Sequence, residues 1–472
     1  MSKANDILER ATGAAAVFRE LDQAQTDRIV REIYHRALDS RVTLARQAHE
    51  ETGIGVWEHK VIKNVIATQL VYDDIRYRKT VGVISSNKRR GITVMAHPIG
   101  PIFAFTPVNN PTSTTIFKAL IAMKTRNPLI ISPHQAARRS TIAAAEICAE
   151  AAEAAGAPGG AIQWLVKPSP DTLDEIMRSR RLALILATGT DRLVAKARLS
   201  GTPIIGVGPG NVPVYIGRTA DVPYAVTSIL ESKLFDNGSI CASEQAVVVK
   251  RADEERIVAE FEKQQAYFLS PEEIEKVGAV AYDQERGIMS PMIVGQSAGR
   301  IAAKAGIDIP QGTKLLVAKL QRVGREEPLS AEILAPILAF YVEEDFDESI
   351  RRCIEITWFG GSGHTAVIYS NHSERIEYFS RVLRAGRILV NMPATQGALG
   401  GIYNTLNPSF TLSCGSEGRN LTTDNITISH LLNINRIARR RPNPRWFSFN
   451  HDRYLDESIP GEELEEGFNR NF

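Results

Sequence analysis

The chain has 472 residues, which exceeds the size at which one hydrophobic core usually stops growing, so at least two domains are expected. A hydrophobic fraction of 43% and a charged fraction of 23% are ordinary for a globular protein and exclude extensive disorder. Because 56 basic and 54 acidic residues nearly cancel, bulk charge does not indicate a nucleic-acid partner.

The cysteine content and the N-terminus indicate a cytoplasmic protein. Four cysteines in so long a chain are too few for a disulfide scaffold, and none forms the CxxC pair typical of structural zinc, so no metal site is expected. Residues 1–20 lack the apolar core of a signal peptide. No stretch approaches the roughly 20 apolar residues that span a bilayer, so no membrane contact is expected.

The first part of the chain predicts helices followed by a hairpin. Residues 5–50 carry apolar side chains at helical spacing. His35, His49 and His59 are interpreted as residues on helix surfaces. Residues 80–97 read as two short strands around a turn at 87–91. This hairpin is either an ordinary surface feature or a ribbon that reaches a second subunit.

The rest of the chain alternates between short apolar runs and helical stretches, which predicts βαβ units and parallel sheets. The first block has predicted strands at Ile99–Phe105, Pro128–Ile131, Leu182–Leu186 and Pro203–Val207, and predicted helices at Thr114–Lys124, Ser140–Ala155 and Asp191–Leu199. The second block starts near residue 245, with predicted strands at Ala246–Val249, Lys314–Ala318, Ala366–Ser370 and Arg387–Val390. The domain boundary is placed near residue 236.

Cys241 is the leading candidate for chemistry. It follows the turn-forming run Asp236-Asn237-Gly238 and precedes a predicted strand. Backbone N–H groups of such a loop would stabilise a thiolate, although a free cysteine also serves as a small buried apolar residue. Cys148 and Cys353 are interpreted as packing residues within helices, and Cys414 as a loop residue that lies near a site or is structural.

Two polar residues occupy loops that suit a catalytic site. Asn109 lies between prolines at the end of a predicted strand, where its amide would serve either as an oxyanion donor or as part of a plain turn. His364 lies in the glycine-rich run 360–365 directly before a strand.

Two glycine-containing segments follow predicted strands. Residues 187–190 open a helix, so their N–H groups are placed to meet a phosphate. Residues 206–211 contain Pro209, which prevents a clean helix start. Neither is a GxGxxG fingerprint, and tight turns explain both equally well.

Together these segments resemble the aldehyde dehydrogenase superfamily, in particular its coenzyme-A-acylating branch, over residues 10–437. The segments that carry the resemblance are Phe235–Gly238 with Ile240–Gln245, Gly206–Asn211, Gly363–Thr365, Asn391–Ala394 and Cys414–Ser416. The branch includes acylating succinate-semialdehyde and sulfoacetaldehyde dehydrogenases and one half of bifunctional aldehyde–alcohol dehydrogenases. The iron-dependent alcohol dehydrogenase half of the latter is not expected here.

The resemblance implies an α/β fold with a Rossmann-type cofactor domain, an α/β catalytic domain and an oligomerisation ribbon. It divides the chain into a cofactor domain at 1–236 that includes the hairpin, a catalytic domain at 237–420 and a C-terminal segment at 421–472. A homodimer or homotetramer is expected. The basic run after Arg439 is interpreted as a solvated or interface segment.

The resemblance also implies roles for single residues. Cys241 would attack the aldehyde, and Asn109 with the Cys241 N–H would hold the oxyanion. Cofactor contacts, with NAD or NADP, would come from Thr106, Pro107, Ser132, His134, Arg138, Arg139, Thr188, Gly189, Thr190, Gly208, Pro209, Gly210 and Glu332. His364 would assist deprotonation or positioning of coenzyme A.

One difference from the family pattern decides which molecule accepts the acyl group from Cys241. Hydrolytic relatives carry a Glu that activates water, but the equivalent run Val207–Gly210 has no carboxylate. General-base catalysis contributes about 10²–10⁴-fold, so without it a thiol is the better acceptor of the acyl group. A hydrolytic aldehyde dehydrogenase, a cysteine hydrolase or thioesterase, and a non-catalytic assembly protein stay as alternatives.

Arg419 bears on the aldehyde. Acetaldehyde-type members lack this arginine, whereas succinate-semialdehyde members carry it. A guanidinium near the site favours an anionic aldehyde such as sulfoacetaldehyde or succinate semialdehyde. Acetaldehyde is the alternative substrate, and an ion pair between Arg419 and Glu417 or a neighbouring subunit is the alternative role.

Overall fold

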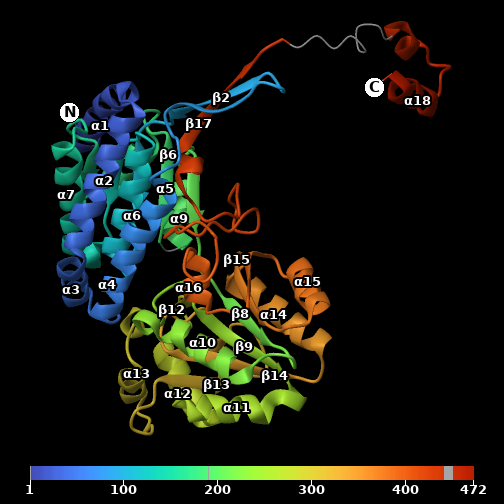
Figure 1. Ribbon diagram of the computed structural model, residues 1–472. Helices are drawn as coiled ribbons and strands as arrows, with labels where there is room; N and C mark the ends of the chain where they lie inside the picture. Colours follow the sequence, from blue (N-terminus) through green and yellow to red (C-terminus); the bar gives the residue numbers. More distant parts are fainter. Residues whose placement is uncertain (1, 190, 441–449, 472) are drawn as a thin grey trace. The chain divides into compact units, whose positions relative to one another are not determined.

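The computed structural model describes residues 2–189, 191–440 and 450–471 (Figure 1). Thr190 and most of the basic run after Arg439 lie outside the described residues. The backbone forms two compact units, of which the first comprises residues 1–80 and 98–433 and the second residues 81–97 and 434–472.

The first unit begins with a helical layer, as residues 5–50 predicted. It consists of α1 (Lys3–Glu20), α2 (Gln23–Asp39), α3 (Arg41–Thr52), α4 (Trp57–Val65), a π-helical turn η1 (Ile66–Leu70) and α5 (Val71–Ile75). Local chemistry sets the helix ends. Asp22 and Gln25 form a capping box at the start of α2, and Gly53, with a φ of 65°, ends α3.

The first sheet is parallel, with strand order β5-β4-β3-β6-β7. Its strands are β3 (Ile102–Phe105), β4 (Leu129–Ser132), β5 (Ile162–Trp164), β6 (Leu184–Thr188) and β7 (Ile204–Val207), and its helices are α6 (Pro111–Lys124), α7 (Arg138–Ala154), α8 (Pro170–Met177) and α9 (Asp191–Arg198). Successive side chains of a strand point to opposite faces of the sheet, and helices bury both faces. Ile102 and Ala104 pack with α2, α6 and α7, which lie side by side in Figure 1, and Phe103 and Phe105 pack with α1, α8 and α9.

The second sheet has seven strands, also parallel, in the order β10-β13-β14-β9-β8-β15-β16. Its strands are β8 (Val212–Ile216), β9 (Glu244–Lys250), β10 (Ala266–Phe268), β13 (Leu315–Lys319), β14 (Ile337–Glu343), β15 (Gly363–Tyr369) and β16 (Ala385–Val390). Val247 and Val249 pack towards α10 (Val222–Leu234) and α11 (Glu254–Lys263), whereas Ala246 and Val248 pack on the opposite face, with α14 (Phe346–Gly360) and α15 (Ser373–Val382).

The remaining elements of this part are short. They are α12 (Pro271–Ala281), β11 (Tyr282–Asp283), β12 (Ile288–Met289), α13 (Ala298–Ala305) and α16 (Ala394–Leu399). All eight strands predicted in the two alternating blocks are present, with ends shifted by a few residues. Within the two parallel sheets, strands β5, β8, β10 and β14 were not predicted.

The second sheet starts before the boundary expected at residue 236. Strand β8 pairs with β9 and β15, so a division by sheets falls between Val207 and Val212. The sequence did not show this because β8 contains Pro213 and follows the glycine loop directly, which reads as one continuous turn.

The second unit contains the expected hairpin. Strand β1 (Gly82–Asn87) pairs antiparallel with β2 (Ile92–Pro98), and β17 (Leu432–Ala438) completes a three-stranded sheet. The described end of the chain forms the helix α18 (Gly461–Asn471). Nowhere in the described ranges is a helix both long and apolar enough to cross a bilayer.

Candidate active site

The loop before Cys241 has an unusual backbone. A 3₁₀ turn at Phe235–Gly238 leads from α10, and Asp236, Asn237 and Gly238 all have positive φ, at 52°, 53° and 70°. Asp and Asn tolerate this region better than most residues, and glycine tolerates it freely. A run of such residues persists only where the surroundings hold it. We call residues 235–241 the nucleophile loop.

The surroundings of Asp236 supply that support. Its buried carboxylate accepts hydrogen bonds from Val56 N at 2.7 Å, Lys60 Nζ at 2.9 Å and Ser239 Oγ at 2.7 Å, and from Lys63 Nζ. Burial alone would raise the pKa of Asp236, but the two lysines and these donors lower it to about 2. The carboxylate is therefore ionised at neutral pH and fixes the nucleophile loop to helix α4.

The thiol of Cys241 is protonated at neutral pH in this conformation. Burial, then the nearby carboxylate of Glu332, raises the pKa of Cys241 to about 12. The cation of Arg387 and the Cys241 N–H oppose this rise without cancelling it. The loop N–H therefore acts in the direction that the sequence predicted, but burial of the sulfur has the larger effect.

Gly210 brings three predicted site residues together. Its N–H donates to Glu332 Oε1 at 2.8 Å. A Cβ atom at Gly210 would collide with the Cys241 carbonyl oxygen and lie 3.0 Å from Cγ of His364. Cys241, His364 and Glu332, which are far apart in the sequence, therefore meet around one glycine.

His364 lies inside strand β15 rather than in the loop before it. Its ring is buried, Nδ1 lies 3.0 Å from Thr365 Oγ1, and Nε2 has no hydrogen-bond partner among the described residues. Burial, then the charge of Arg387, holds the pKa of His364 well below its usual range. The ring is neutral at physiological pH and has a polar atom available to a ligand.

Asn109 lies beside the nucleophile loop, as an oxyanion donor requires. Its side-chain Nδ2 donates to the backbone carbonyl of Ser239, and the backbone carbonyl of Asn109 accepts from Lys60 Nζ at 3.1 Å. An amide NH₂ has two hydrogens, so one donor stays for a substrate oxygen.

The loop with Cys414 packs against the same glycine region. Cys414 is buried, and a Cβ atom at Gly363 would collide with the Cys414 carbonyl oxygen. Asn420, near the end of the loop, accepts from Gly206 N at 3.0 Å through Oδ1. Exposed Arg419 has a φ of 56°. Glu417 pairs with Arg384 at 3.1 Å, so the alternative ion pair between Arg419 and Glu417 is not formed.

Five of the predicted cofactor residues lie at one edge of the first sheet. Thr106 and Pro107 follow β3, Ser132 ends β4, and Thr188 with Gly189 ends β6. These strands are neighbours in the sheet, and Thr106 N donates to Ser132 O at 3.2 Å. The Thr188 hydroxyl is buried without a hydrogen-bond partner among the described residues.

The predicted adenosine loop holds a carboxylate that the sequence did not reveal. Glu51, from α3, accepts from the N–H groups of Arg139 and Ser140, each at 2.7 Å, at the start of α7. Arg139 Nε also lies 3.5 Å from Glu51. Arg138 is half-buried, and exposed His134 accepts from Ala136 N at 3.2 Å. The loop therefore presents both signs of charge.

Sequence reasoning missed the residues that support the site. The sequence did not single out Lys60 and Lys63, yet both are buried. His59 was interpreted as a surface residue, but it is half-buried and its Nδ1 accepts from Asp236 N at 2.8 Å. A lysine pair at i, i+3 spacing, which places both side chains on one face of α4, was the available signal.

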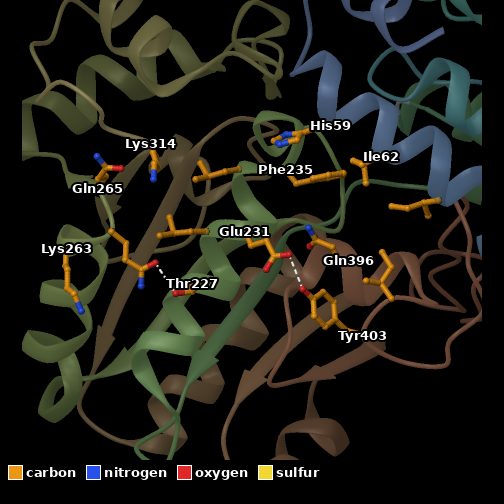
Figure 2. A pocket seen from close by; sticks show the side chains of 15 residues that line it. His59, Ile62, Thr227, Glu231, Phe235, Lys263, Gln265, Lys314, Gln396 and Tyr403 are labelled. Carbon is orange, nitrogen blue, oxygen red and sulfur yellow. Dashed lines mark hydrogen bonds between the residues drawn. The ribbon is translucent and has the colours of Figure 1, made fainter. Parts of the chain in front are cut away.

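A cavity of about 780 Å³ borders the nucleophile loop at Phe235 (Figure 2). Phe235 and His59 line one side, and Tyr403, Glu231 and Gln396 line another. Tyr403 donates to Glu231 at 3.0 Å, and the buried Oε1 of Gln396 has no hydrogen-bond partner among the described residues. None of the predicted site residues lines this cavity.

Comparison with known proteins defines the class. Residues 1–405 match the model of the aldehyde dehydrogenase family. A solved acetylating aldehyde dehydrogenase from Geobacillus thermoglucosidasius is 42% identical, with a TM-score of 0.90 over 93% of this chain and 98% of that one. The chain belongs to the aldehyde dehydrogenase family.

The chain is also similar to two curated dehydrogenases. It is 43% identical to an aldehyde-alcohol dehydrogenase of Clostridium acetobutylicum over 92% of this chain, but spans only 50% of that relative's length. It is 34% identical to an acetylating succinate-semialdehyde dehydrogenase of Clostridium kluyveri, over 92% of this chain and 95% of that one.

Proposed function

We propose that the protein is a coenzyme-A-acylating aldehyde dehydrogenase that oxidises a short-chain aldehyde with NAD or NADP and passes the acyl group to coenzyme A. The observation that carries this proposal is the meeting of Cys241, His364 and Glu332 around Gly210, in a loop without a carboxylate of its own. Relatives named as acetylating or acylating enzymes support it.

The residues at the edge of the first sheet fit a nicotinamide dinucleotide. In open parallel sheets, ligands bind beyond the carboxyl ends of the strands where the chain order reverses, which here is between β3 and β6. Thr106, Ser132 and the unpartnered Thr188 hydroxyl lie at those ends. Glu332 would contact the ribose of the nicotinamide half. When bound, the cofactor supplies the acceptor for the hydride of the aldehyde.

In the first half-reaction, Cys241 Sγ loses its proton to solvent and forms a bond to the aldehyde carbon, whose C=O π bond breaks to leave the oxyanion of a thiohemiacetal. The Cys241 N–H and the second Nδ2 hydrogen of Asn109 would donate to the oxyanion. Loss of the hydride converts the thiohemiacetal into a thioester on Cys241.

In the second half-reaction, the coenzyme A thiol attacks that thioester and the Cys241 sulfur leaves. His364 Nε2, which has no partner among the described residues, is placed to accept a hydrogen bond from the coenzyme A thiol and so to assist its deprotonation or to position it, although the lowered pKa makes this ring a weak base. The loop 207–210 contains no carboxylate that could activate water to attack the thioester instead of coenzyme A.

One contact favours hydrolysis as a second candidate. Glu332 lies close enough to Cys241 to raise the pKa of the thiol. A carboxylate is therefore near Cys241 even though the loop 207–210 contains none. Its Oε1 accepts from Gly210 N, however, which holds it in place as a ligand-binding group rather than a free base.

For the substrate, we propose a short anionic aldehyde. Exposed Arg419 is not paired with Glu417, which supports this choice. A relative named acylating sulfoacetaldehyde dehydrogenase, from Bilophila wadsworthia, is 34% identical over 92% of this chain. Acetaldehyde is the alternative.

We propose that the β1–β2 hairpin joins subunits into a homodimer or homotetramer. A cytoplasmic location accords with four cysteines that form no disulfide.

The deciding experiment follows absorbance of the reduced cofactor with aldehyde, with and without coenzyme A, and identifies the product by mass spectrometry. We expect acyl-coenzyme A to form only when coenzyme A is present, and no product from Cys241→Ala. Free acid formed at the same rate without coenzyme A would establish the hydrolytic alternative. Thioester hydrolysis without a nicotinamide would establish a cysteine thioesterase.

A further inference from the structure

Helix α4 carries a buried charge cluster that faces the nucleophile loop. Lys60 Nζ lies 2.9 Å from Asp236 Oδ2, and Lys63 Nζ donates to the same oxygen. The side chains of Lys60, Lys63 and Asp236 are only 3%, 1% and 0% exposed. We call these three residues the Lys–Asp–Lys cluster. Burying three charges is costly, so the arrangement calls for a role beyond stability.

The Lys–Asp–Lys cluster joins the two loops that the chemistry must bring together. Lys60 Nζ donates to Asn109 O at 3.1 Å, and Lys63 Nζ donates to Asn110 Oδ1 at 2.6 Å. Lys63 Nζ also donates to Ser239 Oγ at 3.1 Å, two residues before Cys241. Because Asn109 Nδ2 donates to Ser239 O, the loops are held both directly and through α4.

The two lysines give the cluster one more positive than negative charge. Burial lowers the pKa of Lys63 to about 8, while Asp236 and the charge of Cys241 act to raise it. The other titratable groups that act on Cys241 are Glu332 and Cys414, which disfavour a thiolate, and Arg387, which favours it. His59 is the remaining titratable neighbour of the cluster, and burial, more than Lys63, lowers its pKa.

We propose that Lys63 is a positioning residue for the nucleophile: it fixes the nucleophile loop against the Asn109 loop, and its ammonium charge favours the ionised form of Cys241. This inference rests on Cys241 being the reactive thiol of the proposed function. It does not depend on which aldehyde or acyl acceptor the protein uses.

The test is the pH dependence of Cys241 alkylation by iodoacetamide, read by mass spectrometry of the Cys241 peptide, which requires no turnover. Lys63→Gln removes the charge and keeps a hydrogen-bond donor. We expect it to shift the alkylation profile below about pH 8, where wild-type Lys63 carries its charge, so that alkylation at pH 7 is about tenfold slower. Lys63→Arg keeps the charge and is expected to restore at least half of that shift.

Lys60→Gln is the matched control, because it also removes one lysine from Asp236 but leaves the contact with Ser239 intact. It is expected to shift the profile less than Lys63→Gln. An unshifted profile in folded Lys63→Gln, or equal shifts in the two variants, would overturn the proposal.

If circular dichroism shows that Lys63→Gln does not fold, Ser239→Ala decides. Slower alkylation of Cys241 in that variant supports the positioning role, and the wild-type rate overturns it. A wild-type protein in which Cys241 is not alkylated would instead contradict the proposed function, so the two failures are distinguishable.

Discussion

The backbone N–H of Gly210 donates a hydrogen bond of 2.8 Å to the carboxylate of Glu332. This single contact joins the glycine loop after β7 to the segment before β14. Because Gly210 also lies against Cys241 and His364, the position admits no side chain.

Gly210→Ala is therefore expected to reduce kcat/KM at least about 100-fold, because the added methyl would displace Cys241 by the better part of an ångström, and misplacement on that scale costs catalysis heavily. Steady-state kinetics measure the effect. Gly299→Ala is the control, since a Cβ atom there meets open space, and it should leave activity and thermal stability near wild type. Equal activity in the two variants would contradict the assigned geometry.

Glu332→Gln is expected to make Cys241 more reactive towards iodoacetamide. The Glu332 carboxylate raises the thiol pKa, so its removal lowers that pKa and increases the thiolate fraction at pH 8. Cofactor affinity, measured by titration of protein fluorescence, should fall in the same variant. Slower alkylation would show that Glu332 does not oppose ionisation of Cys241.

Asp236→Asn is expected to lower the free energy of unfolding by about 3–5 kcal/mol at pH 7, because it leaves two buried lysines without their carboxylate. The folded pKa of Asp236 is depressed, so its stabilisation is present above its usual pKa near 3.8 and is lost as pH falls towards about 2. Urea unfolding at pH 7 and pH 3 measures both effects. Asp174→Asn, which removes a surface pair with Arg178, should cost less than about 1 kcal/mol.

Arg419→Ala is expected to lower kcat/KM for sulfoacetaldehyde about tenfold and to leave acetaldehyde unchanged, because the lost guanidinium contact is with the anionic group. Arg384→Ala, which removes the partner of Glu417, is the matched control and should leave the ratio of the two values as in wild type. An unchanged ratio in Arg419→Ala would refute the anionic substrate.

Arg138→Ala and Arg139→Ala test the choice of cofactor. Arg139 pairs with Glu51, so we expect Arg138→Ala to reduce NADP affinity more than Arg139→Ala does. The Kd of each cofactor, measured by fluorescence titration, checks this. Unchanged selectivity in both variants would remove any role for these arginines at a 2′-phosphate.

The strands were predictable wherever a buried apolar run stood between clear turns. Strand β9 is such a case, because Val247 and Val249 pack on one face of the sheet and Ala246 and Val248 pack on the other. Strand β8 was not, since Pro213 weakens its signal and its pairing with β9 is a long-range property of the sheet. The alternation of strands and helices predicts a sheet but not which loop crosses from one sheet to the next.

The candidate site follows the same division. Local turn chemistry and resemblance pointed to Cys241, Asn109 and His364. The ionisation of Cys241 did not follow, because it depends on burial and on Glu332, a residue distant in the sequence. Lys63 was also missed, because a lysine becomes informative only when its burial is known.

The Lys–Asp–Lys cluster also bears on how the protein acquires its reactive thiol during folding. Strand β9 pairs with β8 and β14 through contacts within the second sheet, whereas Asp236, in the left-handed turn at Asp236–Gly238, is held by two lysines from α4. A folding intermediate with a complete second sheet but an undocked α4 would lack the ordered loop that presents Cys241. Such an intermediate would also lack the burial that raises the pKa of Cys241, so its thiol would be more open to oxidation than in the folded protein.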